Sequence, residues 1–181
     1  KKAWMTATLF RDWMSSCVLP ELRSYCEKER LEFKILIVLD NAPSHPFDLD
    51  ELSENIKFVY LPPNTTAILQ PMDQGAISNF KSYYLRRNFR ELFTATEGID
   101  NITMKTFWKN FTILDGIKYI AESWNEVSNK SMNGCWRKLW PECVHSPLKN
   151  DTNNDRITAI KEIVDLASAL QVEGMEVEDI E

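Results

Sequence analysis

The sequence FKILIVL at residues 33–39 is followed directly by Asp40 and by the turn-forming sequence NAPSHP at residues 41–46. A nearly continuous apolar run of this length, rich in β-branched residues, is typical of a strand buried in a parallel sheet. A second run, KFVYL at residues 57–61, ends at Pro62 and Pro63 and predicts another strand. Helical patterns before, between and after these runs predict an α/β fold with right-handed crossovers.

The rest of the chain carries apolar residues at helical spacing. We expect a break near Leu19 in the N-terminal helical region, because proline favours the first turn of a new helix and Pro20 follows. The tryptophans at 108, 124, 136 and 140 fall on helical patterns and are expected to pack in the core. The predicted helices cover residues 3–14, 21–30, 48–55, 71–93, 107–127, 132–139 and 156–170.

The predicted elements and the charge of the C-terminal segment divide the chain into three parts. Residues 1–97 hold the predicted strands and their helices, residues 98–145 form a helical extension, and residues 146–181 form a polar linker, a terminal helix and an acidic tail. Residues 151–181 contain nine acidic and two basic residues, so the remainder is near +1 although the whole chain carries −6. The pI of about 5.1 is therefore compatible with nucleic-acid binding by the body of the chain.

The sequence gives little support for a membrane partner or for a zinc site. No apolar run approaches the roughly 18 residues of a membrane span, so we expect no membrane partner. The four cysteines form no C-x-x-C pair, which favours reduced, mostly buried thiols. A zinc site from Cys135, Cys143 and His145 lacks paired spacing and a fourth ligand.

Two aspartates stand where chemistry is common in α/β proteins. Asp40 follows a predicted buried strand, and open α/β sheets place reacting groups at the carboxyl ends of their strands. Asp73 stands at the start of the predicted helix over residues 71–93. Each aspartate also has a purely structural explanation. The side chain of Asp40 can cap the turn that follows it, and the helix dipole favours an acid at the position of Asp73. Brought together, they would bind Mg²⁺ or Mn²⁺ and support in-line phosphoryl transfer.

Three stretches carry a resemblance to a known family: ILIVLDNAPSHP at 35–46, YLPPNTTAILQPMDQGAISNF at 60–80, and residues 81–93. They resemble the DDE nuclease domain of Tigger-type transposases, in the pogo branch of the mariner-like superfamily, whose domesticated relatives include centromere protein B and the Jerky proteins. The resemblance covers most of residues 1–145. It implies a partial RNase H-like fold, with residues 33–39 and 57–61 as the fourth and fifth strands, followed by a C-terminal helical extension.

The resemblance also implies a function. Asp40 matches the second and Asp73 the third catalytic aspartate of the family, with DNA as substrate and the nucleus as location. Mg²⁺ or Mn²⁺ is the cofactor expected of a complete domain, and residues 1–181 alone need not bind it. The family's first catalytic aspartate lies on a strand that would precede Lys1, so we expect residues 1–181 alone to be inactive. The strand over residues 33–39 would then present an apolar edge to a partner or a second copy.

Other functions remain as alternatives. One is a domesticated, non-catalytic nuclear module that binds DNA or a protein. A phosphatase of the haloacid dehalogenase type finds less support, because Ala42 stands where its second aspartate is needed.

Further polar residues flank the two aspartates and are candidates for contact with a DNA backbone. Those in loops are equally suited to turn formation and capping, and the basic residues within 81–90 are equally suited to a solvated helix face. The candidates are Asn41, His45, Asn64, Thr65, Thr66, Gln70, Gln74, Lys81, Arg86, Arg87 and Arg90.

Overall fold

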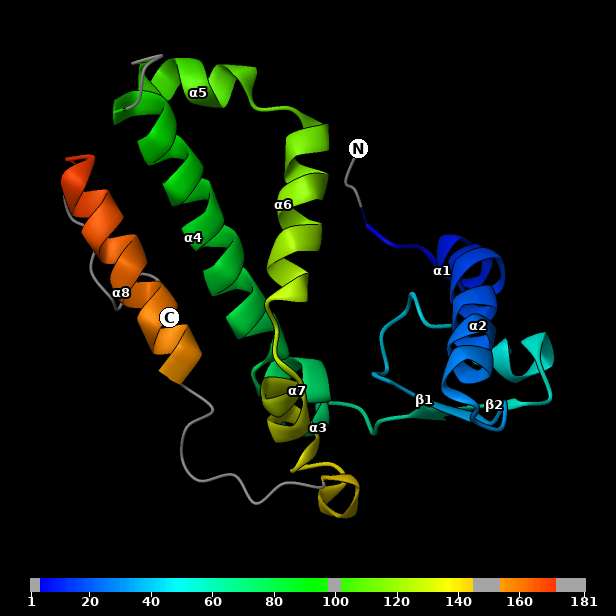
Figure 1. Cartoon of the computed structure of the whole chain (residues 1–181). Helices are drawn as coiled ribbons and strands as arrows, with labels where there is room; N and C mark the ends of the chain where they lie inside the picture. The colour runs from blue at the N-terminus through cyan, green and yellow to red at the C-terminus, as the bar shows by residue number, and fades with distance from the viewer. Residues whose placement is uncertain (1–3, 98–101, 145–153, 172–181) are drawn as a thin grey trace. The chain divides into compact units, whose positions relative to one another are not determined.

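The computed structural model describes residues 4–97, 102–144 and 154–171 (Figure 1). They form two compact units, Lys1–Gln70 and Pro71–Glu181, and each is considered by itself. The loop expected near Gly98, most of the linker expected from residue 146 and the acidic tail from residue 172 lie outside the described residues. In the described part of the chain, no helix is long and apolar enough to cross a membrane.

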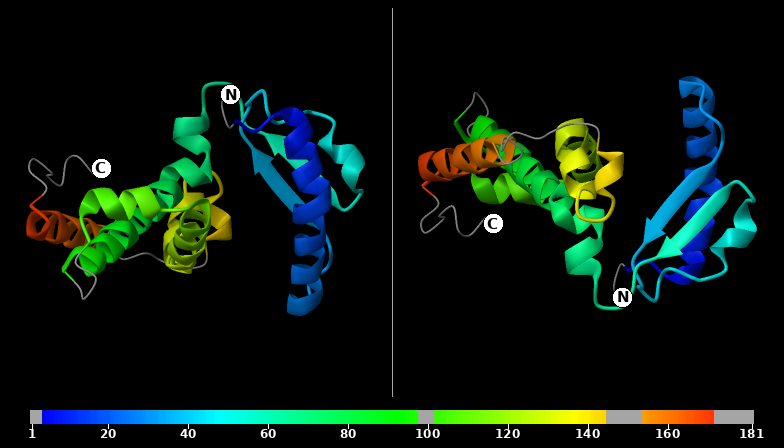
Figure 2. Two further views of the ribbon diagram at one scale, coloured as in Figure 1. Left: turned by 90° about the horizontal axis from the view of Figure 1, so that it is seen from above. Right: turned by 90° about the horizontal axis from the view of Figure 1, so that it is seen from below.

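The first unit is built on two parallel strands. β1 (Ile35–Leu39) and β2 (Ile56–Tyr60) run parallel and side by side (Figure 2). Their register runs from Ile35↔Ile56 to Leu39↔Tyr60. The flanking elements are α1 (Ala7–Trp13), the π-helical segment η1 (Met14–Val18), α2 (Leu19–Glu29), the 3₁₀ turn η2 (Leu49–Leu52) and α3 (Thr66–Leu69). The prediction of an α/β fold with two strands is confirmed at this level.

Within the described residues of the first unit, one face of the sheet is covered by the N-terminal helical segment and the other is left uncovered. Phe10 and Met14 from the N-terminal helical segment pack with Leu39, Ile56 and Phe58. On the opposite face, Leu36 and Val59 keep 45% and 41% of their surface exposed. Within this unit, only one face of the strand that the sequence predicts as buried is therefore covered. An unbroken apolar run does not show how many faces have a covering layer.

The expected break near Leu19 is also absent. α1, η1 and α2 follow one another without interruption, and the amide of Leu19 donates to the carbonyl of Met14, five residues earlier. A proline inside an α-helix lacks an N–H group and clashes with the carbonyl four residues before it. The wider π turn directly before Pro20 changes that local geometry, so the helical segment continues through the proline.

The second unit is helical. It contains η3 (Pro71–Gln74), α4 (Ala76–Glu97), α5 (Met104–Asn110), α6 (Ile113–Asn125), α7 (Asn129–Trp136), η4 (Pro141–Cys143) and α8 (Asn154–Ala169). α6 and α8 flank the long helix α4 (Figure 1). The buried apolar residues of α8 include Ala159, Ile160, Ile163 and Ala167.

Three expectations about this unit need correction. The helix expected over residues 107–127 is two helices, because Thr112 and Asp115 form a capping box that starts α6. The helix expected from residue 71 begins only at Ala76, after the separate turn η3. Of the tryptophans expected in the core, Trp108, Trp124 and Trp140 are 42–50% exposed. Their helical spacing indicated a shared face but not that the face is covered.

Candidate functional site

Asp40 lies immediately after β1, at the edge where both parallel strands end. The pairing continues past the strands, since the amide of Leu61 donates to the carbonyl of Leu39 at 2.8 Å. The two loops that leave this edge therefore start side by side. They line an open cavity of about 510 Å³, formed by Asp40, Asn41, Ala42, Pro63, Asn64, Thr66 and Ala67. The structure thus brings together four of the predicted site residues: Asp40, Asn41, Asn64 and Thr66.

Two hydrogen bonds and a ring contact hold the loop after Asp40 in place. His45 Nδ1 donates to the backbone carbonyl of Asp40 at 3.1 Å, and its ring lies 4.6 Å from the ring of Phe10. Because a carbonyl only accepts, Nδ1 carries the proton. The hydroxyl of Tyr60 donates to the carbonyl of Pro46. His45 therefore stabilises the turn, and its contact with DNA stays a prediction.

The Asp40 carboxylate has an unusual local environment. Its Oδ1 is buried and receives no hydrogen bond from the described residues. His45 Nδ1 lies 2.8 Å from this oxygen, but only the Asp40 carbonyl meets the angular requirement of a hydrogen bond with that N–H. A buried carboxylate oxygen without a hydrogen bond is rare and calls for an explanation; besides the close approach of His45 Nδ1, a bound ion would supply one. Carboxylate and amide oxygens, as in Asp40, Asn41 and Asn64, are the ligands that Mg²⁺ and related hard cations prefer.

The loop after β2 is shaped by its own polar residues. Asn64 adopts a left-handed backbone conformation with φ of 64°, which asparagine tolerates better than most residues. The hydroxyl of Thr65 donates to the carbonyl of Pro62 at 2.7 Å. Gln70, at the end of this segment, has a buried Oε1 without a hydrogen-bond partner among the described residues. Turn formation thus accounts for the backbone of Asn64 and the hydroxyl of Thr65.

Asp73 lies in the second unit, in the turn η3. Its side chain is exposed, and the next turn of chain bends at Gly75, whose φ of 131° strongly favours glycine. A small cavity follows this bend and is lined by Gln74, Gly75, Ser78, Asn79, Ser131, Gly134 and Cys135. Among the described residues, no three His, Cys, Asp or Glu side chains gather around one point. Asp40 and Asp73 belong to separate units, so a metal site shared between them stays a prediction.

The arginines of α4 contact glutamates from neighbouring helices. Arg87 Nη2 lies 2.7 Å from a carboxylate oxygen of Glu122, at ion-pair distance but without hydrogen-bond geometry. Arg90 binds Glu162 of α8 with two nitrogens, including an Nη2–Oε2 contact of 2.7 Å. This hydrogen bond to Arg90 is the main reason that the pKa of Glu162 is lowered.

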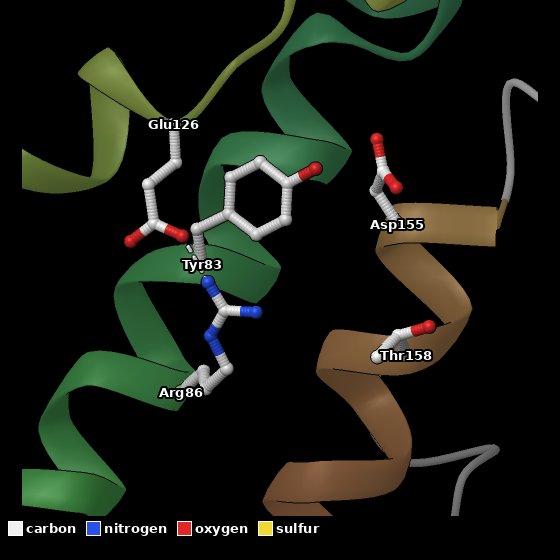
Figure 3. A pocket seen from close by; sticks show the side chains of 5 residues that line it. All are labelled: Tyr83, Arg86, Glu126, Asp155 and Thr158. Carbon is white, nitrogen blue, oxygen red and sulfur yellow. Dashed lines mark hydrogen bonds and ion pairs between the residues drawn. The ribbon is translucent and has the colours of Figure 1, made fainter.

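Arg86 borders a polar pocket in the second unit (Figure 3). Its guanidinium binds Glu126 and lies 5.2 Å from the centre of the Tyr83 ring, while Asp155 and Thr158 of α8 also line the pocket. Burial raises the pKa of Tyr83, and the nearby carboxylate of Asp155 adds to this effect.

The sequence predicted the arginines of α4 as site residues but did not predict the glutamates that contact them. Only the pair Arg87–Glu91, four residues apart at 3.3 Å, has a spacing that a sequence reveals. Lys81 is exposed and forms no ion pair with the described residues. Contact of these four basic residues with phosphate stays a prediction, but three of them already have a structural role.

Comparison with known proteins gives a consistent set of matches. Residues 1–136 match the family described as DDE superfamily endonuclease. The Jerky protein of Mus musculus is 28% identical over 161 residues, which cover 88% of this chain and 27% of that protein. Tigger transposable element-derived protein 7 of Homo sapiens is 30% identical over 151 residues, covering 77% of this chain and 27% of that protein. The chain spans about a quarter of the length of these relatives. No solved structure matches it.

Proposed function

The chain belongs to the DDE superfamily endonuclease family, and on this premise we propose that Asp40 and Asp73 supply two acidic ligands of a metal-dependent site that cuts and joins DNA. In this proposal the first part, residues 1–97, belongs to an RNase H-like nuclease domain. Residues 98–145 extend it, and residues 146–181 form a linker, a helix and an acidic tail. The protein that contains the chain acts in the nucleus.

The environment of Asp40 is the observation that carries this proposal. Its carboxylate lies at the shared end of two parallel strands, with one oxygen buried and without a hydrogen bond from the described residues. When bound there, Mg²⁺ or Mn²⁺ would satisfy that oxygen and supply the charge that in-line phosphoryl transfer needs. His45 donates a hydrogen bond to the Asp40 carbonyl and so fixes the loop that orients Asp40. Asn41, Asn64 and Thr66 line the same cavity and offer neutral groups for a phosphate backbone.

Metal binding by the chain itself tests the proposal. Free Mn²⁺ measured by electron paramagnetic resonance during titration gives the affinity directly. We expect Asp40→Asn and Asp73→Asn each to weaken Mn²⁺ binding by at least about 10- to 100-fold, which is the loss that follows removal of a group that only orients a ligand. Asp12→Asn and Asp165→Asn are matched controls, because both remove an exposed aspartate from the corresponding unit.

The double variant shows whether the two aspartates share one site. If they hold the same metal centre, the effects of the two substitutions are not additive, because residues in one network couple. Additive losses would mean two separate weak sites, and unchanged affinity in Asp40→Asn would contradict the proposal at its main residue.

Cleavage of supercoiled plasmid tests the reaction. In a protein that carries this chain together with the family's first catalytic acid, we expect nicking with Mg²⁺ or Mn²⁺ that Asp40→Asn and Asp73→Asn abolish. For residues 1–181 alone we expect no nicking, because they supply two of the three acids. DNA binding without nicking in the longer protein would instead favour a domesticated binding module.

A further inference from the structure

A polar pocket of about 250 Å³ lies in the second unit, and neither Asp40 nor Asp73 lines it (Figure 3). Its lining comes from three helices: Tyr83 and Arg86 of α4, Glu126 directly after α6, and Asp155 and Thr158 of α8. The packing of α8 along α4 holds two sides of the pocket together. Both residues of α8 are exposed, so molecules in solution can reach the pocket.

Tyr83 contributes a buried hydroxyl to this pocket. The residue is only 3% exposed, and its hydroxyl forms no hydrogen bond with the described residues. In Figure 3 the hydroxyl is directed toward Asp155, whose charge adds to the effect of burial in raising the pKa of Tyr83. A buried hydroxyl without a hydrogen bond is costly, so its presence calls for a partner inside the pocket. The hydroxyl oxygen can accept a hydrogen bond from such a partner.

The charges around the pocket favour a cation. The lining holds two acids and one base, which gives a formal charge of −1. Arg86, the base, already binds Glu126, and its Nε lies 3.9 Å from Glu162. Asp155 forms no ion pair with the described residues. An anion such as phosphate would therefore meet an unpaired carboxylate and would have to displace Glu126 from Arg86, whereas a cation would pair with Asp155.

The acceptors of the pocket suit an ammonium group better than other cations. Oxygens of Tyr83, Glu126 and Asp155 come from three different helices, and a primary ammonium carries three N–H donors that can reach acceptors on several sides. A second guanidinium would compete with Arg86, whose own guanidinium lies 5.2 Å from the centre of the Tyr83 ring. A metal ion finds less support, because among the described residues no three His, Cys, Asp or Glu side chains gather around one point.

We propose that this pocket binds an alkylammonium group, which a free amine or a lysine side chain can supply. The ammonium nitrogen donates hydrogen bonds to the hydroxyl of Tyr83 and to the carboxylate of Asp155, and the alkyl chain leads out to solvent. A hydrogen bond between two charged groups is stronger than one to a neutral hydroxyl, so Asp155 contributes more to binding than Tyr83. Because Asp155 is exposed, water competes for these contacts, and we expect a dissociation constant in the millimolar range.

Titration of the whole chain with n-butylammonium chloride tests the proposal. Backbone amide signals are followed by NMR spectroscopy at constant ionic strength, and we expect saturable shifts at the residues that line the pocket. Asp155→Asn should weaken binding by about 10-fold and Tyr83→Phe by about 5-fold, as each removes one hydrogen bond to the ligand. Asp165→Asn and Tyr84→Phe are matched controls, because they make the same changes on α8 and α4 outside the pocket. Both should bind like the wild type.

Two other salts define the results that would overturn the proposal. Tetramethylammonium chloride supplies a positive charge without N–H donors, and sodium phosphate supplies an anion, so neither should shift the signals of the pocket. Shifts with phosphate, or equal shifts with both ammonium salts, would contradict the proposal. Asp155→Asn also removes an acid from the first turn of α8, so its circular-dichroism spectrum is compared with that of the wild type. Tyr83→Phe leaves that turn intact, and unchanged affinity in this variant would contradict the role of the hydroxyl.

Two further probes distinguish the source of the ammonium group. Diaminobutane represents a free amine, and a glycine-rich peptide with one lysine represents a protein side chain. Tighter binding of the diamine than of the peptide would identify a free amine as the ligand. Tighter binding of the peptide, lost when its lysine is acetylated, would identify a protein. Failure of both probes and of n-butylammonium to bind would overturn the proposal.

Discussion

The two units use polar residues in different ways. In the first unit, Asp40, Asn41, Asn64 and Thr66 line one cavity because two parallel strands end at the same edge. In the second, Arg86, Arg87 and Arg90 face glutamates from α6 and α8 and help to hold three helices together. The sequence predicted the two asparagines, Thr66 and the three arginines alike as contacts for a DNA backbone. In the structure, the first group lines a cavity and the arginines contact glutamates.

The units also differ in how their cores are built. The first packs a helical segment against a two-stranded sheet, with Leu49 fully buried beside it. The second packs α8 along α4, with Ile163 fully buried on α8. The strongest test of the comparison is whether each core stabilises its own unit.

The largest expected effects come from Leu49→Ala and Ile163→Ala. Each removes a fully buried side chain and should lower the free energy of unfolding by about 2–5 kcal/mol. If the units unfold separately, urea titration followed by circular dichroism shows two transitions, and each variant shifts only one of them. Val59→Ala and Ile157→Ala, at exposed positions in the same units, should have small effects. A single transition that both core variants shift equally would show that the units unfold together.

The next effect concerns the arginines of α4. Arg86 is 12% exposed and binds Glu126, so Arg86→Met removes a hydrogen bond between charged groups and should cost about 1–3 kcal/mol. Lys81→Met removes an exposed cation from the same helix and should change stability by less than about 0.5 kcal/mol. Urea titration measures both, and fluorescence anisotropy with duplex DNA measures binding. Weaker DNA binding by Arg86→Met with unchanged stability would reverse the assignment of Arg86 to a structural role.

The contrast between the units explains what the sequence predicted well. The strands, the turn after Asp40 and the convergence of the two loops follow from local patterns plus the geometry of parallel strands. The ion pairs that link α4 to residues outside it join positions 35–76 apart, such as Arg90 and Glu162, and no local pattern encodes them. Asp73 lies outside α4 because the chain bends at Gly75, which has a positive φ. The sequence around Gly75 otherwise predicts one uninterrupted helix.

Burial was the other property that sequence did not determine. FKILIVL and the tryptophans both predicted apolar faces correctly, but Leu36, Trp108 and Trp124 remain exposed among the described residues. A periodic pattern shows which residues share a face. It does not show whether another layer covers that face, because the covering layer is a separate part of the fold.

A smaller effect distinguishes a functional from a structural carboxylate. Asp40→Asn keeps the shape of the side chain and removes a charge whose Oδ1 is buried and lacks a hydrogen bond from the described residues. We expect the stability of the first unit to stay within about 1 kcal/mol of the wild type, or to rise, as happens when functional strain is removed. Urea titration without metal ions measures it. A large loss of stability would show that Asp40 serves the fold, with Asp12→Asn as the control for removing a charge.

The smallest expected effect concerns pH and the pair Arg90–Glu162. The pKa of Glu162 is lowered from its ordinary value of 4.5, mainly by the hydrogen bond from Arg90. A carboxyl group with a lowered folded-state pKa contributes stability above its unfolded value, and this contribution is lost as pH falls through the folded value. Because both side chains are partly exposed, the contribution after solvent screening is about 0.5 kcal/mol.

Glu162→Gln tests this contribution. Between about pH 6 and pH 3, the second unit of the wild type should lose more stability than that of Glu162→Gln, as measured by the urea midpoint. Glu142→Gln removes an exposed carboxylate that pairs with no described residue, and it should keep the wild-type pH dependence. Equal pH dependence in all three proteins would mean that the Arg90–Glu162 contact adds no net stability. In that case apolar contacts such as those of Ile163 would hold α8 on α4. The arginines of α4 would then contribute no more to stability than charged residues on a solvent-exposed helix face.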